Sequence, residues 1–393
     1  MSVNGDVAEV ESSAPMGFPE LDQVDVGWES LPWTRLDPER EYFRTVVRSR
    51  PDVVGVHVFF LPDDVAPQAA FVGRVEDVSL RVSAGYRSVY SPRVRAITLV
   101  HGGVLGVERP DRAQEIVARL RDALTAGVAE AVFLPALRTD SELYAAAASV
   151  RFPFRQPFAV RTLHWGLQLP GSFEEFLATR STKTRKNLRV DRNRLRRDYG
   201  EALELRVFRD PSDADELFRD VATVAAKTYQ HGLGVAFANT DEDKALTALA
   251  LDRGWFRAYV LYIGGAPVAF WLGSVYARTF FTGTPGYDPG FADYGIGRYL
   301  LVRVIEQLCG DDEVDQIDYG FGDAEYKRRF GNQSWEEADV VLFARRFRPV
   351  RVNVMRTALA TTLGLVKRAL GRAGVAARLK RRWRRRLTQQ AGP

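Results

Sequence analysis

The stretch that decides the fold is 255–301, "WFRAYVLYIGGAPVAFWLGSVYARTFFTGTPGYDPGFADYGIGRYLL". Its first part is rich in apolar, β-branched and aromatic residues, which predicts consecutive antiparallel strands. The glycine pair at 264–265 predicts one hairpin turn, and 275–278 a second one. Gly295 and Gly297 then stand directly before an apolar run with helical spacing. Such a turn can bind a phosphate, because the first N–H groups of a helix are unpaired and its dipole favours an anion.

The sequence around this stretch completes an α/β domain. We expect a basic helix at 172–200, a strand at 202–208, a helix at 210–230, strands within 255–288, a helix at 296–308, a strand at 312–322, a short helix or turn at 323–331 and a strand at 336–346 that closes the sheet. The basic helix carries nine Lys or Arg between positions 180 and 197. A solvated helix face is its simpler interpretation, and binding of an anionic glycan or nucleic acid is the alternative. A Rossmann site is excluded, because no third glycine follows at the right spacing.

The first half of the chain also has an α/β pattern. Strands are expected at 53–61, 74–82, 94–100 and 130–137, with the strand at 74–82 exposed on one face, and helices at 109–127 and 139–150. No repeat is visible residue by residue, but both halves are mixed α/β segments of similar size. This leaves room for two diverged copies of one fold. The expected organisation is a disordered acidic arm at 1–30, domains at 31–168 and 169–346, and a basic tail at 347–393.

Charge is distributed unevenly along the 393 residues. Positions 340–393 hold 15 of the 55 Lys and Arg and no acidic residue, so the rest has 40 basic (55 minus 15) and 50 acidic residues. The basic character therefore belongs to the tail. Cys309 is the only cysteine, which excludes an internal disulfide, and no clustered Cys or His spacing suggests a metal site. Neither a membrane span nor a signal peptide is apparent, so a cytoplasmic location is expected.

The tail combines apolar and basic residues. Met355, Leu359, Leu363, Val366, Leu370 and Ala373 recur at spacings of three and four, and "KRRWRRR" occupies 380–386. This pattern predicts a basic amphipathic helix that contacts an anionic membrane through residues 352–386, with Trp383 as an interface anchor. Nucleic-acid binding is the less favoured alternative, because an apolar stripe has no purpose on a phosphate backbone.

Three short motifs carry a resemblance to a known family. They are "DYGIGRYLL" at 293–301, "DYGFGDAEYKRRFG" at 318–331 and "STKTRKNLR" at 181–189. After a strand meander, they resemble the GNAT acyltransferase superfamily, in its CelD/BcsL-like branch that is related to the FemAB transferases. The resemblance covers about 173–343. Gly295 and Gly297 match the glycines of the acyl-CoA motif, whereas Ala292 stands where Gln or Arg is usual.

The resemblance implies both a fold and an activity. The fold is α/β (α+β), with tandem GNAT-like domains that share a cleft, each a mixed, mostly antiparallel sheet flanked by helices. The first half would be a degenerate copy. The activity is direct transfer from acetyl-CoA or another acyl-CoA, without a metal, to an amine of a cell-envelope sugar, glycolipid or peptide precursor. Two alternatives stay open: a FemAB-type transferase that uses aminoacyl-tRNA, and a non-catalytic membrane-associated scaffold.

The resemblance also suggests roles for individual residues. Gly295, Ile296, Gly297 and Arg298 would hold the CoA pyrophosphate, Asp318 would act as general base and Tyr326 as acid, and Lys327, Asp323 and His231 would contact the substrate. Each role has a structural alternative. Asp318 on a central strand must be paired if it is not functional. Tyr326 can be a core residue, Lys327 a surface residue, and Asp323 the cap of the following helix.

Overall fold

Eleven strands hydrogen-bond side by side in one continuous sheet, in the order β1-β2-β5-β6-β13-β7-β12-β11-β10-β9-β8. The computed structural model describes residue 28 and residues 31–61, 67–84, 87–228 and 240–372. The strands are β1 (Val53–Leu61), β2 (Ala69–Ser79), β5 (Arg93–Leu105), β6 (Ala131–Arg138), β7 (Arg161–Gln168), β8 (Leu203–Phe208), β9 (Phe256–Ile263), β10 (Ala266–Tyr276), β11 (Thr279–Tyr287), β12 (Gln316–Phe321) and β13 (Gln333–Phe343), with a separate hairpin of β3 (Val82–Ala84) and β4 (Arg87–Tyr90).

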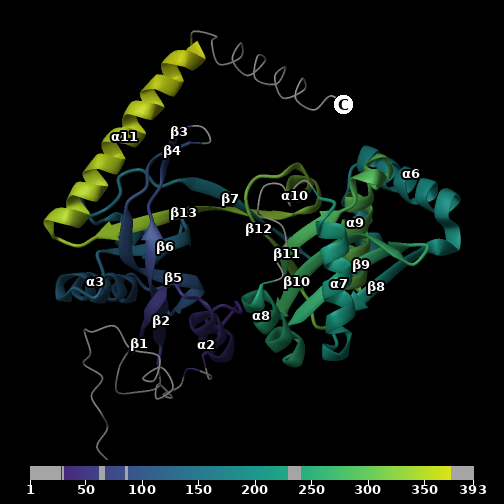
Figure 1. The fold of residues 1–393 in the computed structure, drawn as a ribbon, viewed down its shortest axis with the longest axis horizontal. Coiled ribbons are helices and arrows are strands. Elements are labelled where there is room, and N and C mark those ends of the chain that lie inside the picture. The colour runs from purple at the N-terminus through teal and green to yellow at the C-terminus, as the bar shows by residue number, and fades with distance from the viewer. Residues whose placement is uncertain (1–27, 29–30, 62–66, 85–86, 229–239, 373–393) are drawn as a thin grey trace, which may run out of the picture.

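Helices cover both faces of this sheet (Figure 1). They are α2 (Arg40–Ser49), α3 (Pro110–Ala126), α4 (Glu142–Ala148), α5 (Phe173–Ala178), α6 (Thr182–Tyr199), α7 (Ala214–Ala225), α8 (Asp241–Asp252), α9 (Ile296–Cys309), α10 (Glu325–Phe330) and α11 (Phe347–Arg372). In the first half, α3 and α4 pack on one face and α2 on the other. In the second half, α9 packs on one face and α7 on the other.

The sheet repeats the same arrangement on either side of its central pair, β13 and β7. Moving outward, β6, β5, β2 and β1 correspond to β12, β11, β10 and β9. In each half one pair is parallel, β5 with β6 and β11 with β12, and each of these pairs matches three residues of one strand to three of the other. The helices α3 and α9 connect them. The prediction of two GNAT-like copies, each a mixed and mostly antiparallel sheet, is confirmed.

The two halves exchange their last strands. β7 ends the first half but pairs with β12, and β13 ends the second half but pairs with β6. The prediction that the strand at 336–346 closes the sheet is therefore wrong. Its sequence fits the observed position, because Val340, Val341, Leu342 and Phe343 are all buried and need cover on both faces. Figure 1 shows both strands crossing between the halves.

Most other predicted elements are present with shifted ends. The glycines of the 264–265 hairpin have φ of 58° and 76°, as a tight turn requires. The helix expected at 172–200 is two helices, because Ser181 starts α6 by accepting a hydrogen bond from the Thr184 N–H. The strand expected at 74–82 begins earlier, at Ala69, and ends at Ser79; its first residues are buried, whereas burial alternates from 76 to 82 as predicted. Helix α8 was not predicted.

The two ends of the chain are only partly described. Of the arm predicted at 1–30, only Trp28 is described. It is 1% exposed and donates its indole N–H to Pro38 O at 2.8 Å. The predicted tail helix is present as α11, whereas Trp383 and the basic run at 380–386 lie outside the described residues. Among the helices of the described segments, none is long and apolar enough to cross a membrane.

Candidate active site

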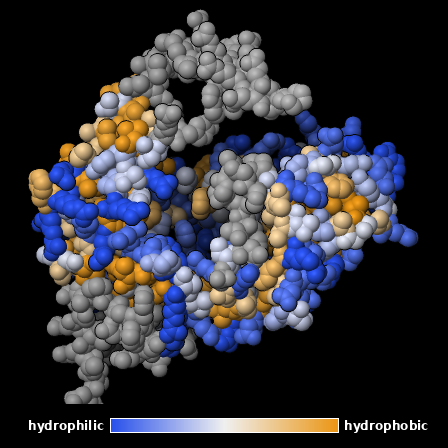
Figure 2. All heavy atoms as spheres, in the orientation of Figure 1, coloured by the Kyte–Doolittle hydropathy of each residue, from blue (hydrophilic) through white to orange (hydrophobic). Residues whose placement is uncertain are grey.

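The parallel strands β11 and β12 form a fork. They pair from Thr279 with Gln316 to Phe281 with Asp318, and then diverge. Beyond this point β11 continues along β10, with a bulge opposite Leu272, while β12 pairs with β7. The carboxyl ends of both strands open toward the start of α9, which follows β11 in the chain. Ligands of α/β sheets bind outside such diverging carboxyl ends. On the face seen in Figure 2, the molecule is hollowed between its two halves.

The Gly-x-Gly turn opens α9 at this fork. Gly295 is the N-cap, with φ of 64°, and has no side chain to satisfy the N–H groups of the first turn. Ile296 is buried in the core, and Gly297 follows as the second residue of the helix. A Cβ at Gly297 would lie 3.3 Å from Tyr287 Cδ1, so glycine keeps the approach open. The predicted anion site therefore has unpaired backbone donors.

Arg298 does not point at this site as a free cation. Its Nε donates to Asp191 Oδ2 on α6 at 2.7 Å. The basic helix α6 lies against the turn, and Arg194 from this helix donates to Asp293 O at 2.9 Å and lies 4.6 Å over the Tyr294 ring. The sequence placed these basic residues on a solvated face. Most of them are exposed, as expected, and Arg194 also places positive charge beside the Gly-x-Gly turn.

Asp318 lies at the fork and is only 8% exposed. Its Oδ1 is 2.6 Å from His164 Nε2 and accepts the Gly320 N–H at 2.7 Å, while Oδ2 accepts from Arg35 Nη2 at 2.6 Å. Burial alone would raise the pKa of Asp318. The His164 hydrogen bond, the Arg35 charge and the Gly320 N–H outweigh burial and lower that pKa below its usual value.

His164 connects Asp318 to a second carboxylate. Its ring stacks on Trp335 with centroids 4.4 Å apart, and its Nδ1 lies 2.9 Å from Glu337 Oε1 without the alignment of a hydrogen bond. Trp335 Nε1 donates to the same oxygen at 2.7 Å. Burial lowers the pKa of His164, but the bonds to Asp318 and the charge of Glu337 raise it overall. We call Arg35, Asp318, His164 and Glu337 the buried ion network.

The buried ion network constrains the role of Asp318. The expectation that Asp318 is paired is met, since both of its oxygens are engaged. A general base needs a lone pair open to the substrate and a pKa near the working pH, whereas both Asp318 oxygens already accept hydrogen bonds and its pKa is lowered. The geometry favours a structural role, and catalysis by Asp318 stays a prediction. The sequence analysis missed Arg35, His164 and Glu337. A signal existed for Glu337, which is a polar residue inside the strand expected at 336–346, whereas no strand was predicted around His164.

Lys327 supports the end of β12. Its Nζ donates to Gly320 O at 3.0 Å and to Phe321 O at 2.7 Å, and burial lowers its pKa. Gly320 and Gly322 have φ of 71° and 96°, so the backbone bends sharply where Lys327 holds it. The surface alternative for Lys327 is therefore wrong. A direct contact with substrate stays a prediction.

Asp323 and His231 complete the predicted substrate contacts. Asp323 accepts from Arg328 Nη1 at 2.8 Å. The N-cap of α10 is Ala324, without a side-chain hydrogen bond, so the predicted capping by Asp323 is wrong. An alanine side chain has no acceptor, and the carboxylate pairs with the nearby guanidinium instead. His231 lies outside the described residues.

Tyr326 packs on the opposite side of the fork from Asp318. Its ring meets Trp271 and Tyr319 edge-on, with centroids 6.0 and 6.1 Å away, and burial raises its pKa. Tyr319 Oη and Trp271 Nε1 are buried and have no hydrogen-bond partner in the part of the chain that the structure describes. Each such group costs about 1–3 kcal/mol when unsatisfied. Both are therefore donors without an acceptor, and both rings contact Tyr326.

Comparisons with known proteins agree with this geometry. Residues 182–328 match the family model described as the acetyltransferase (GNAT) domain. The solved structure of FemX shares the fold at 10% identity, with a TM-score of 0.55 over 82% of this chain and 96% of that chain. The C-terminal DUF2156 domain of a protein named as a lysylphosphatidylglycerol synthetase, from Agrobacterium fabrum, matches at 13% identity. Its TM-score is 0.51, and the match covers 87% of this chain and 97% of that chain. No curated protein sequence is significantly similar to this chain.

Proposed function

We propose that the chain transfers an acyl group from acyl-CoA to an amine, because residues 182–328 match the model of the acetyltransferase (GNAT) domain. The observation that carries this proposal is the uncapped start of α9 at the β11–β12 fork, where Gly295 and Gly297 leave backbone N–H donors open. Acetyl-CoA or a longer acyl-CoA is the expected co-substrate. When bound, it supplies the activated thioester.

The chain's own residues would divide the work. The first turn of α9 binds the pyrophosphate through its N–H groups, and the basic residues of α6 add positive charge beside it. The fork holds the acyl group so that the amine reaches its carbonyl carbon, where the C–N bond forms as the C–S bond breaks. We propose that Tyr319 Oη and Trp271 Nε1, which are buried without a partner among the described residues, donate hydrogen bonds to the oxygen or sulfur that gains charge. Tyr326 beside them is proposed to protonate the departing sulfur, and the proton that the amine loses passes through water to restore the Tyr326 hydroxyl.

The proposed acceptor is an amine on a cell-envelope sugar, glycolipid or peptide precursor. This follows from the CelD/BcsL-like resemblance together with the tail. Helix α11 leads into the basic sequence that ends the chain, and the helix contains no acidic residue. We propose that residues 352–386 contact an anionic membrane surface, so that the protein works at the cytoplasmic face of a membrane.

A second candidate is FemAB-type transfer from aminoacyl-tRNA. The observation in its favour is α6, whose basic side chains are largely exposed and lie next to the Gly-x-Gly turn. An exposed row of Lys and Arg suits an RNA backbone, although α6 has no aromatic side chain besides its last residue, Tyr199, on which a base would stack.

Calorimetry on the full chain separates these candidates. The titrants are CoA, acetyl-CoA, a longer acyl-CoA and an aminoacyl-tRNA, each at two salt concentrations. Micromolar binding of an acyl-CoA supports the first proposal. Binding of tRNA alone, which weakens steeply with salt, supports the second. If none of the four ligands binds, both transferase proposals are contradicted and a non-catalytic scaffold remains.

A further inference from the structure

A cavity of about 330 Å³ lies at the far end of the first half, between the last turns of α3 and the end of β13. Its floor is apolar and includes Leu124, Val150, Phe154 and Leu342. Small-molecule sites start at about this volume and have this kind of lining. None of the residues that line it belongs to the fork or to α9. The cavity is therefore separate from the proposed acyl-transfer site.

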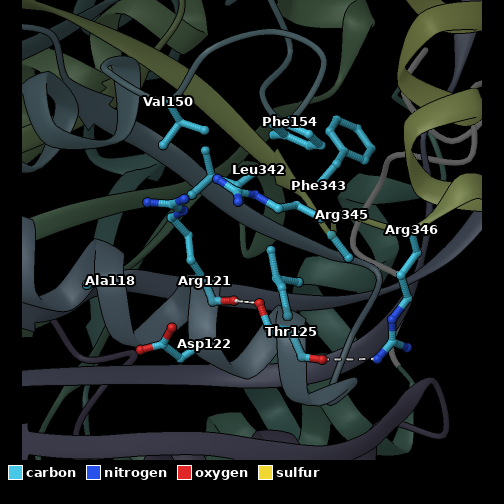
Figure 3. Close-up of a pocket in the computed structure, with 12 residues that line it drawn as sticks. Ala118, Arg121, Asp122, Thr125, Val150, Phe154, Leu342, Phe343, Arg345 and Arg346 are labelled. Carbon is cyan, nitrogen blue, oxygen red and sulfur yellow. Dashed lines mark hydrogen bonds between the residues drawn. The ribbon is translucent and has the colours of Figure 1, made fainter.

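Three arginines surround the cavity. Arg346 donates to Thr125 O at 3.1 Å and so satisfies a carbonyl at the end of α3. The guanidinium of Arg345 lies 5.0 Å over the ring of Phe154. Figure 3 shows the guanidinium groups of Arg121, from α3, and Arg345, from the segment after β13, pointing toward one another across the cavity.

Arg121 and Arg345 have no carboxylate partner among the residues that the structure describes. Some exposed arginines elsewhere do pair with carboxylates, as Arg161 does with Glu336 at 2.8 Å and Arg278 with Asp315 at 2.5 Å. Asp122 is the only acidic residue that lines the cavity, and it points away from both guanidinium groups (Figure 3). Two like charges that face each other repel, and an anion between them turns this repulsion into two charge-assisted hydrogen bonds.

We propose that this cavity binds an anionic lipid, with its phosphate between Arg121 and Arg345 and its first apolar carbons on the floor. The adjoining helix supports a lipid. α11 begins two residues after Arg345, and its first residue, Phe347, is 80% exposed. Val354 and Leu365 are exposed further along α11, which extends away from the body at this edge (Figure 1). A free phosphate would leave the apolar floor unused.

This site adds a lipid-binding pocket to the membrane contact proposed above. It depends on that proposal only because we expect this edge of the molecule to face the bilayer. The test titrates the full chain with a short-chain, monomeric phosphatidylglycerol and, separately, with inorganic phosphate. The variant Arg121→Gln/Arg345→Gln removes the pair. Its control, Arg161→Gln/Arg278→Gln, removes the same charge from exposed pairs that contribute little to stability. Ala118→Leu fills the cavity without changing charge, at an exposed position of α3.

We expect the first variant to weaken lipid binding roughly 100-fold, because it removes two charge-assisted hydrogen bonds that contribute about tenfold each. Ala118→Leu weakens binding as well, and the control does not. Equal losses in the variant and the control would overturn the site, as would phosphate binding as tight as the lipid. Flotation with phosphatidylcholine vesicles, with and without phosphatidylglycerol, tests the membrane contact separately. If the unmodified chain binds the monomeric lipid but does not float with phosphatidylglycerol vesicles, the membrane contact is contradicted and the cavity site is not.

Discussion

Helices α3 and α9 occupy the same place in the two halves, but they begin with opposite chemistry. α9 has Gly295 as its N-cap and Gly297 as its second residue. At the same positions α3 has Arg109 and Asp111, with Pro110 between them. Proline removes one N–H donor, and the Asp111 carboxylate, paired with Arg109 at 2.6 Å, repels an anion. The start of α9 thus leaves open the backbone donors of the proposed anion site, whereas the start of α3 lacks one donor and carries a carboxylate.

The bulges next to the two parallel pairs, β11–β12 and β5–β6, also differ between the halves. Strand β11 bulges at Gly283 and Thr284, and β5 bulges at 100–103. In the first half the bulge is covered, because the Arg35 side chain packs against Gly102. The same arginine then reaches across to Asp318 in the second half. The degenerate half has therefore become a support for the half that we propose to be active.

Removing His164 should give the largest effect, because it breaks the buried ion network that joins the halves. His164→Gln leaves Asp318 and Glu337 buried without their shared partner, so we expect the free energy of unfolding to fall by about 3 kcal/mol. Chemical denaturation measures this change. Arg161→Gln, which removes an exposed pair with Glu336, is the control and should cost less than about 1 kcal/mol. A loss for His164→Gln as small as the control's would contradict the linking role.

The same network predicts how this difference depends on pH. The pKa of His164 is raised in the folded state, so its contribution is full below about pH 6.5 and is lost as pH rises through the folded pKa. The pKa of Asp318 is lowered, so its contribution is full above about pH 4 and is lost as pH falls through the folded pKa. Chemical denaturation of the wild type and of His164→Gln across pH should therefore show the largest difference in the free energy of unfolding between about pH 4 and 6.5. A difference that grows at alkaline pH would be contrary to this.

Giving α9 the residue that α3 carries should abolish its anion site. Gly297→Asp places a carboxylate at the second helical position, as in α3, and we expect acyl-CoA binding by calorimetry to weaken roughly 100-fold. Gly297→Ala tests crowding against Tyr287 alone and should lose much less. Asp111→Gly, the reverse change in α3, should leave affinity unchanged. Equal losses for the Asp and Ala variants would mean that crowding, and not charge, decides binding.

The smallest effect is expected from releasing Arg298. Asp191→Asn weakens the ion pair between Arg298 of α9 and Asp191 of α6. It also removes a negative charge near Gly295. Acyl-CoA binding should tighten roughly threefold at low salt and approach the wild-type value at high salt. Asp140→Asn, which removes a carboxylate from an exposed pair with Arg138 in the other half, is the control. Weaker binding in Asp191→Asn would indicate that the pair itself builds the site.

Local signals in the sequence explain what could be predicted. The hairpin glycines, the Pro110 and Gly127 boundaries of α3 and the start of α9 are each set by residues within a few positions. The exchange of β7 and β13 is not set by nearby residues, because either strand could pair with the apolar strands of either half. Asp318 shows the same limit within the site. Its burial implied a partner, but one partner, Arg35, is 283 positions away in the chain.

The central claim is that acyl-CoA meets the first turn of α9 and not that of α3. Amide hydrogen exchange of the unmodified chain, with and without acyl-CoA, compares the two places in one experiment. We predict slower exchange on binding in the peptide that spans 295–299, and no change in the one that spans 109–113. Protection at 109–113, or none at 295–299 when the ligand is bound, would contradict this claim.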